Sequence, residues 1–300
     1  MLYTIEDMSW VIYALLAAFL YAVVGIVDKF TITKWIKNPF VPPIIFGAMG
    51  FLFSAAIYFF QGFAQLSTFN IALAIFVGII SVVASVAYFK AAKIEEISRL
   101  VPMIFISNVF VVILAAVFIG EIFTLEKYAG IFLLIFGATM ISSRKFDFKP
   151  GKAFWLAMLS GFIWASTAVI VKYLLSFADF WTIFSYTRIG MFIGILPLAY
   201  FYLNDFFLAV RKHGNKVIGV MSVNEILALS GIFSATYAMS IGPVTLVQSL
   251  ISVEPFIVFI LSIIISIFLP KILKEEIDRK TLFLKAVAIT AVIIGAVLVA

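Results

Sequence analysis

A carboxyl group and a proline stand side by side inside an otherwise apolar stretch. The run at 246–269, LVQSLISVEPFIVFILSIIISIFL, carries Glu254 and Pro255 near its middle. A charged carboxyl at mid-depth in hydrocarbon costs about 2.5–3.5 kcal/mol on translocon scales. Pro255 has no N–H, so the carbonyl of Ile251 needs another partner inside the protein. The pair therefore predicts a helix that faces a polar cavity rather than lipid.

Two roles are open for the Glu254 carboxyl. In the functional role, it binds a cationic group of a substrate or carries a coupling proton. In the structural role, it satisfies polar groups that Pro255 leaves free. Glu254 is the leading candidate for a substrate or ion pathway.

Arg188 is a second charge inside an apolar stretch, about 10 Å from the outer end of its predicted helix. Because arginine keeps its proton, the guanidinium has to pair with a carboxylate, reach the interface or bind an anion. An internal ion pair or an interfacial position is the structural interpretation. Recognition of a substrate carboxylate or phosphate is the functional one.

Five uncharged side chains are further pathway candidates. Tyr21 and Trp164 would form an amphipathic wall for a small organic solute. With 34 phenylalanines in the chain, packing is the simpler interpretation of any aromatic residue. Asn108 and Gln248 are amides that bond across helices or face a substrate. Tyr237, just before a short turn, completes the set.

Three charged residues near predicted helix ends are candidate gate residues. Lys29 and Lys172 occupy matched positions, where they anchor at the interface or make a gate contact. Glu225 lies close to the end of a predicted span, as a solvated boundary residue or as part of the same gate.

The composition indicates the class of protein that holds these residues. The chain has 300 residues, 65% hydrophobic and 12% charged, and its mean hydropathy is +1.21. A soluble domain would be nearer half apolar and a quarter charged. So much apolar surface indicates a multi-pass protein of the cell membrane, with the lipid bilayer as a partner.

The same composition excludes several kinds of chemistry. The chain has no cysteine and one histidine, His213, which excludes disulfides, thiolate-bound metals and a histidine metal cluster. We expect no cofactor and no metal, and we assign no catalytic residue. The net charge of +6 requires no nucleic-acid partner, because excess Lys and Arg collect in cytoplasmic loops. The first residues, MLYTIEDMSW, predict a retained helix and not a signal peptide.

Ten apolar stretches are each able to cross about 30 Å of hydrocarbon as a helix, although the fifth is short. They cover residues 10–28, 42–62, 69–90, 100–119, 127–143, 153–174, 181–203, 219–241, 243–269 and 282–300. The predicted fold class is an all-α membrane protein with ten transmembrane helices.

The two halves of the chain resemble each other. Residues 16–22 align with 159–165, and the same offset places Lys29 on Lys172. A slightly larger offset places Tyr88 on Tyr237.

This pattern predicts two five-helix repeats, at 1–145 and 150–300. Because five is odd, the second copy must sit inverted in the membrane, as in many secondary transporters.

The basic residues fall on one side of the predicted membrane. The odd-numbered links hold Lys29, Lys34, Lys37, Lys90, Lys93, Arg99, Arg144, Lys145, Lys149, Lys152, Arg211, Lys212, Lys216, Lys271, Lys274, Arg279, Lys280 and Lys285. The others are Lys127, Lys172 and Arg188. By the positive-inside rule, the odd links are cytoplasmic and both termini face out.

A short motif links these features to a known family. The sequence GEIFT at 120–124, followed by Gly130 and Gly137, resembles the end of the EamA-type repeat in the drug/metabolite transporter superfamily. The run at 229–255, with Tyr237 and the Glu-Pro pair, is similar to the matching part of the second repeat. The resemblance implies ten helices, a central cavity between the repeats, and transport of small metabolites, often outward.

The sequence departs from that pattern in three ways. Ser107-Asn108 stands where the family often has proline, and the second repeat lacks a clean GE motif. Family members generally have cytoplasmic termini, whereas the charge count here predicts the reverse.

Three functions are compatible with the sequence. A secondary transporter that works by alternating access is favoured, and without a Walker motif its energy would come from a proton or substrate gradient. An intramembrane lipid-modifying enzyme would need clustered acids or a metal, and Asp28, Asp147, Asp179, Asp205 and Asp278 lie on different predicted links. A channel would need a continuous polar stripe.

Gly190-x-x-x-Gly194 allows close approach of a neighbouring helix. Contact within one chain is the simpler interpretation, and a homodimer face is the alternative.

Overall fold

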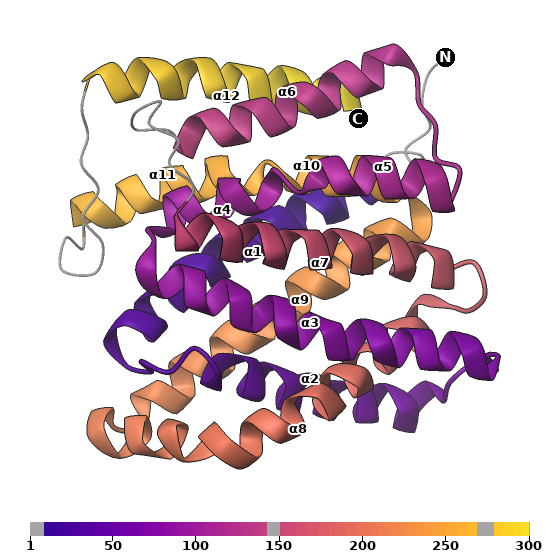
Figure 1. The fold of residues 1–300 in the computed structure, drawn as a ribbon, viewed down its shortest axis with the longest axis vertical. Helices are drawn as coiled ribbons and strands as arrows, with labels where there is room; N and C mark the ends of the chain where they lie inside the picture. The colour runs from indigo at the N-terminus through magenta and orange to yellow at the C-terminus, as the bar shows by residue number, and fades with distance from the viewer. Residues whose placement is uncertain (1–8, 143–150, 269–278, 300) are drawn as a thin grey trace.

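The computed structural model describes residues 9–142, 151–268 and 279–299, which form helices and contain no strand (Figure 1). The helices are α1 (Ser9–Lys34), α2 (Val41–Gln61), α3 (Thr68–Ile94), α4 (Ile97–Phe105), α5 (Asn108–Phe118), α6 (Leu125–Ser142), α7 (Lys152–Leu174), α8 (Phe180–His213), α9 (Lys216–Ile241), α10 (Val244–Ile251), α11 (Glu254–Phe268) and α12 (Arg279–Val299). By length and composition, 8 stretches of the described residues can cross a membrane. The helices α6 and α12, which correspond to the fifth and tenth predicted spans, are not among them.

Two of the membrane-crossing stretches are each divided into two helices. The chain breaks between α4 and α5 at 106–107, and between α10 and α11 at 252–253. Pro255 lies in the first turn of α11, where N–H groups have no partner within the helix, so the proline removes no helical hydrogen bond. From the sequence, we expect Pro255 to leave the carbonyl of Ile251 without its helical partner, close to the second break. No corresponding signal was recognised in the sequence for the first break, and both stretches agree with the predicted fourth and ninth spans.

Two helices run further than the sequence predicts. The helix α1 continues to Lys34 instead of ending at residue 28, since neither glycine nor proline interrupts residues 26–38. The helix α8 continues to His213 instead of ending at residue 203. It begins after Asp179, whose side chain caps the first turn, and stops at Gly214, whose φ of 80° is available to glycine at little cost.

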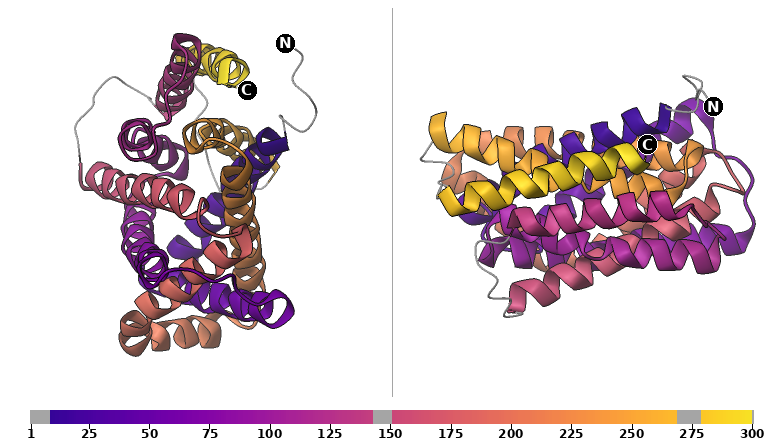
Figure 2. Two further views of the ribbon diagram at one scale, coloured as in Figure 1. Left: turned by 90° about the vertical axis from the view of Figure 1, so that its right-hand side faces the viewer. Right: turned by 90° about the horizontal axis from the view of Figure 1, so that it is seen from above.

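The helices run roughly along one direction, and their packing partners exchange between the two halves of the chain (Figure 1). Thus α1 packs along α9, and α3 packs along α7. The helix α2 packs on α8, and α6 packs on α12. The α6–α12 pair lies at one edge of the bundle (Figure 2, left).

The described links divide between the two ends of the bundle. Those that follow α1, α3 and α8 lie at the left of Figure 1. Those that follow α2, α5, α7 and α9 lie at the right. The outer surface carries large exposed apolar side chains, such as Phe59, Phe60 and Tyr200, which suit contact with lipid.

Glycines allow α3 and α8 to approach closely. A Cβ on Gly190 would lie 2.1 Å from the carbonyl oxygen of Ile75, and one on Gly194 would lie 2.9 Å from a methyl carbon of Val82. The Gly190-x-x-x-Gly194 pair therefore packs within the chain, in keeping with its simpler interpretation.

Candidate functional site

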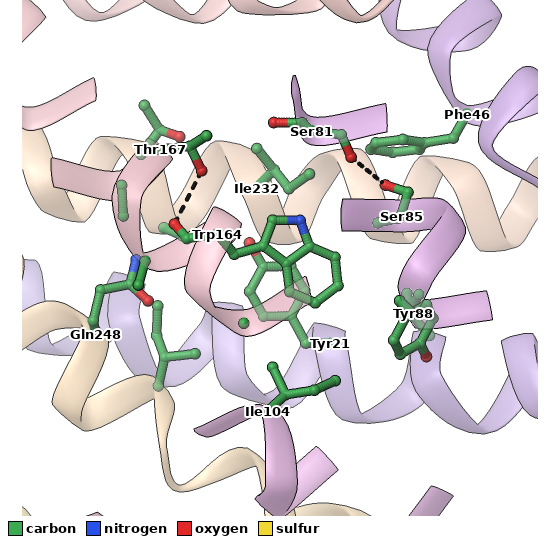
Figure 3. A pocket seen from close by; sticks show the side chains of 18 of the residues that line it. Tyr21, Phe46, Ser81, Ser85, Tyr88, Ile104, Trp164, Thr167, Ile232 and Gln248 are labelled. Carbon is green, nitrogen blue, oxygen red and sulfur yellow. Dashed lines mark hydrogen bonds between the residues drawn. The ribbon is translucent and has the colours of Figure 1, made fainter. Parts of the chain in front are cut away.

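A cavity of about 300 Å³ lies between the helices (Figure 3). Every described helix except α6 and α12 contributes to its lining. The predicted residues that the cavity brings together are Tyr21, Asn108, Trp164, Arg188, Glu225, Gln248 and Glu254.

The two helix breaks deliver a polar residue each to this cavity. Asn108 is the first residue of α5, and Glu254 is the first residue of α11. The amide nitrogen of Asn108 donates to the carbonyl oxygen of Gln248 at 3.0 Å and to the hydroxyl of Ser252 at 2.7 Å. Asn108 therefore bonds across helices, at the break between α10 and α11.

Three carboxyl groups line the cavity from three helices. Asp28 on α1, Glu225 on α9 and Glu254 on α11 are 7%, 4% and 8% exposed. Asn224 donates to the Asp28 carboxylate at 2.7 Å, and Tyr88 lines the same cavity. Glu225 and Glu254 each lie within electrostatic reach of Asp28. The cavity thus concentrates negative charge or protons, depending on the state of these carboxyls.

The guanidinium of Arg188 reaches the same cavity from α8. Its side chain is buried, and Nε and Nη1 have no hydrogen-bond partner. The guanidinium carbon lies 5.8 Å from the ring centre of Phe46 and 5.3 Å from that of Phe184. Within the described ranges, no carboxylate lies within ion-pair distance of the Arg188 guanidinium. The internal ion pair expected for Arg188 is therefore absent from the part of the chain that the structure describes.

Aromatic side chains form part of the cavity wall. Figure 3 shows Trp164 and Tyr21 near the centre of the view, with Gln248 on one side and Tyr88 on the other. The ring centres of Tyr88 and Trp164 are 5.7 Å apart. The amide of Gln248 makes a weak contact with the sulfur of Met239, at 3.7 Å. Tyr21 lies within electrostatic reach of both Glu254 and Arg188.

Tyr237 does not belong to the cavity lining. Its ring packs 4.7 Å from that of Tyr13 and 5.6 Å from that of Phe180. Its neighbours on α9, Ala235, Thr236 and Met239, line the cavity, whereas Tyr88 itself lines it from α3. Tyr88 and Tyr237 therefore do not occupy corresponding places in the two halves.

Lys29 and Lys172 make matching contacts outside the cavity. The ammonium of Lys29 donates to the carbonyl oxygens of Ala92 and Glu95, at 2.6 and 2.7 Å, at the end of α3. The ammonium of Lys172 donates to those of Met239 and Gly242, at 2.8 and 2.9 Å, at the end of α9. Each lysine satisfies carbonyls that a helix end leaves free.

Glu121, from the GEIFT motif, caps the N-terminal end of a helix, whereas the two lysines bind carbonyls at C-terminal ends. Its carboxylate accepts hydrogen bonds from the backbone N–H groups of Val244 and Thr245, at 2.9 and 3.0 Å. These are the first residues of α10, where free N–H groups and the helix dipole favour an anion. The motif residue thus ties the first half of the chain to the second, with Gly120 turning the chain at a φ of 75°.

Sequence reasoning missed Asp28, Tyr88 and Asn224 as cavity residues. It placed Asp28 on a link because α1 was expected to end there, and the unbroken run beyond residue 28 was the signal that could have corrected this. Glu225 was treated as a boundary residue, but it is buried and lines the cavity.

The cavity also changes one argument from the sequence. Dispersed acids weighed against an enzyme, yet the fold brings Asp28 together with Glu225 and Glu254. Within the described ranges, no group of His, Cys, Asp and Glu has the arrangement of a metal site. The choice between transporter and enzyme therefore depends on the family and the cavity, and no longer on the spread of the acids.

Eight membrane-crossing stretches around a polar cavity define a multi-pass helical membrane protein. The model of the EamA-like transporter family matches residues 8–143 and places the protein in the drug/metabolite transporter superfamily. The resemblance inferred from the GEIFT motif is thereby confirmed.

The fold of this chain is similar to that of solved structures, of which 28 chains match it. One crystal structure has a TM-score of 0.67 and 15% sequence identity, and the match covers 97% of this chain and 95% of the other. At that identity the likeness concerns the fold alone. No curated protein matches the chain.

Proposed function

We propose that the protein is a secondary transporter that moves a small organic metabolite across the cytoplasmic membrane by alternating access. The observation that carries the proposal is the cavity, which holds three carboxyls and the buried guanidinium of Arg188 between helices of both halves. Two nitrogens of this guanidinium, Nε and Nη1, have no hydrogen-bond partner. Buried charges within membrane spans are costly, and they mark substrate and ion pathways. The family assignment favours transport over enzymatic chemistry.

We further propose that the chain consists of two inverted five-helix repeats, at 1–145 and 150–300, which form ten transmembrane helices. The family match covers residues 8–143, close to the first of these. The exchange of packing partners, α1 with α9 and α3 with α7, is what a two-fold relation between the halves would produce. The matching contacts of Lys29 and Lys172 point the same way.

The direction of transport that we propose is outward, coupled to protons or driven by exchange. Carboxyls in the cavity offer places for a proton, and Arg188 offers a place for an anionic group. A saturable counterflow in proteoliposomes, faster when a proton gradient is imposed, would support the proposal. Conversion of a lipid without solute flux, or flux at channel rates, would contradict it.

We propose that the odd-numbered links face the cytoplasm. The described odd links, which follow α1, α3 and α8, share one end of the bundle and are rich in lysine and arginine. A single cysteine placed near Met1, in this cysteine-free chain, should react with an impermeant maleimide from outside the cell. Labelling only after lysis would show that the N-terminus faces the cytoplasm, which contradicts the proposed orientation.

A further inference from the structure

The amide of Asn224 presents a buried oxygen that accepts no hydrogen bond. Asn224 is 2% exposed, lines the cavity and donates through Nδ2 to the Asp28 carboxylate at 2.7 Å. Its Oδ1 atom has no partner. An unsatisfied acceptor at such depth is unfavourable unless a donor reaches it from the cavity.

The orientation of this amide follows from its neighbour. An ionised carboxylate only accepts hydrogen bonds, so the NH₂ group of Asn224 has to face Asp28. The amide oxygen consequently points away from Asp28.

The carboxylate that Asn224 binds has two further carboxyl groups near it. Glu225, the next residue on α9, is buried and lies within electrostatic reach of Asp28, as does Glu254 on α11. Between the described residues, no hydrogen bond involves the carboxyl of Glu225 or Glu254. The cation among the lining residues, Arg188, contacts the rings of Phe46 and Phe184.

We propose that Asp28, Asn224 and Glu225 form a binding site for the primary ammonium group of an organic solute. An ammonium carries three N–H donors and a positive charge, which match one amide oxygen and two carboxyls. The site joins α1 to α9, and therefore joins the two halves of the chain. This inference rests on the proposed transporter function and specifies the chemistry of its substrate.

A quaternary ammonium group is the informative comparison. It has the same charge but no N–H donor, and it is recognised by aromatic faces. The cavity contains such faces in Trp164 and Tyr88, so the structure offers both modes of recognition. Hydrogen-bonded recognition by Asn224 requires that methylation of the ammonium weaken binding.

The test uses the purified full-length chain in detergent. Its thermal unfolding midpoint is measured against rising n-butylammonium chloride, butyltrimethylammonium chloride and sodium chloride, at matched ionic strength. We expect n-butylammonium to raise the midpoint at concentrations at least about tenfold lower than the trimethyl compound, since charge-assisted hydrogen bonds are lost on methylation. Sodium should have no effect at those concentrations.

Variants assign the effect to the site. Asn224→Leu and Glu225→Gln should each weaken n-butylammonium binding about tenfold or more. Glu225→Gln keeps the Asn224–Asp28 hydrogen bond and serves if Asn224→Leu does not fold. Glu126→Gln, an exposed change on α6 outside the cavity, should leave binding unchanged.

Equal or tighter binding of the trimethyl compound would overturn the proposal in favour of aromatic recognition. If sodium raises the midpoint equally, the site binds inorganic cations and the proposal is wrong. If no amine raises the midpoint, the chain has no ammonium site. Counterflow in proteoliposomes decides the transporter separately. A chain that binds n-butylammonium but moves no solute keeps the site and loses the transport function, whereas saturable flux with no amine binding does the reverse.

Discussion

The break between α4 and α5 and the break between α10 and α11 each divide a membrane-crossing stretch, but the residues that follow them differ in what they contact. Asn108 at the first break has its amide engaged with Gln248 and Ser252. Glu254 at the second break faces the cavity and makes no hydrogen bond to another described side chain. Both residues open a helix, where a side chain is held at a defined depth.

The difference separates a structural use of a broken helix from a chemical one. A neutral amide costs little to bury when carbonyl and hydroxyl partners are present, and it joins two helices. A carboxyl without partners is costly to bury and has capacity to bind a proton or a cation. We therefore expect the two positions to fail in different ways when they are changed.

Glu254→Gln should have the largest effect on transport. The change keeps the shape of the side chain but removes the charge, so we expect solute flux in proteoliposomes to fall about 10- to 100-fold, by analogy with the loss of a charged hydrogen bond. The unfolding midpoint should hold or rise, because a buried charge is removed. Wild-type flux would make Glu254 a structural residue like Asn108.

Asn108→Leu should show the opposite pattern. It removes the two hydrogen bonds that Asn108 donates, to the carbonyl of Gln248 and to the hydroxyl of Ser252, and we expect a loss of about 1 kcal/mol in unfolding free energy. Flux, corrected for the amount of folded protein, should fall less than in Glu254→Gln. A larger loss of flux at unchanged stability would place Asn108 in the substrate pathway.

Lys29→Met and Lys172→Met should have small and equal effects. Each removes two hydrogen bonds to helix-end carbonyls, which water can partly replace, so we expect about 1 kcal/mol of destabilisation from either change. Thermal or denaturant unfolding of both variants tests the equivalence of the two halves. If one variant loses transport while its stability is retained, that lysine has the gate role considered from the sequence.

Much of this architecture could be predicted from the sequence. Hydropathy predicts the apolar helices, and the offset that places Lys29 on Lys172 is matched by their equivalent contacts. Glu254 and Arg188 were recognisable because charges inside apolar runs stand out. The unpaired state of Arg188 was not, because pairing depends on which helices become neighbours.

The missed residues share a physical reason. Asp28 and Glu225 lie close to the ends of apolar runs, where hydropathy alone cannot distinguish a helix that continues from a link. Their burial arises from contact between α1 and α9, which are far apart in the chain. Tyr237 shows the converse, since it was expected in the pathway but packs against Tyr13 outside the cavity lining.

The two lysines that close the ends of α3 and α9 hold carbonyl oxygens and not carboxylates. Carbonyl oxygens do not titrate, so protonation of acids deeper in the protein changes none of these four bonds. Binding of a proton or a solute in the cavity would therefore leave both joints intact.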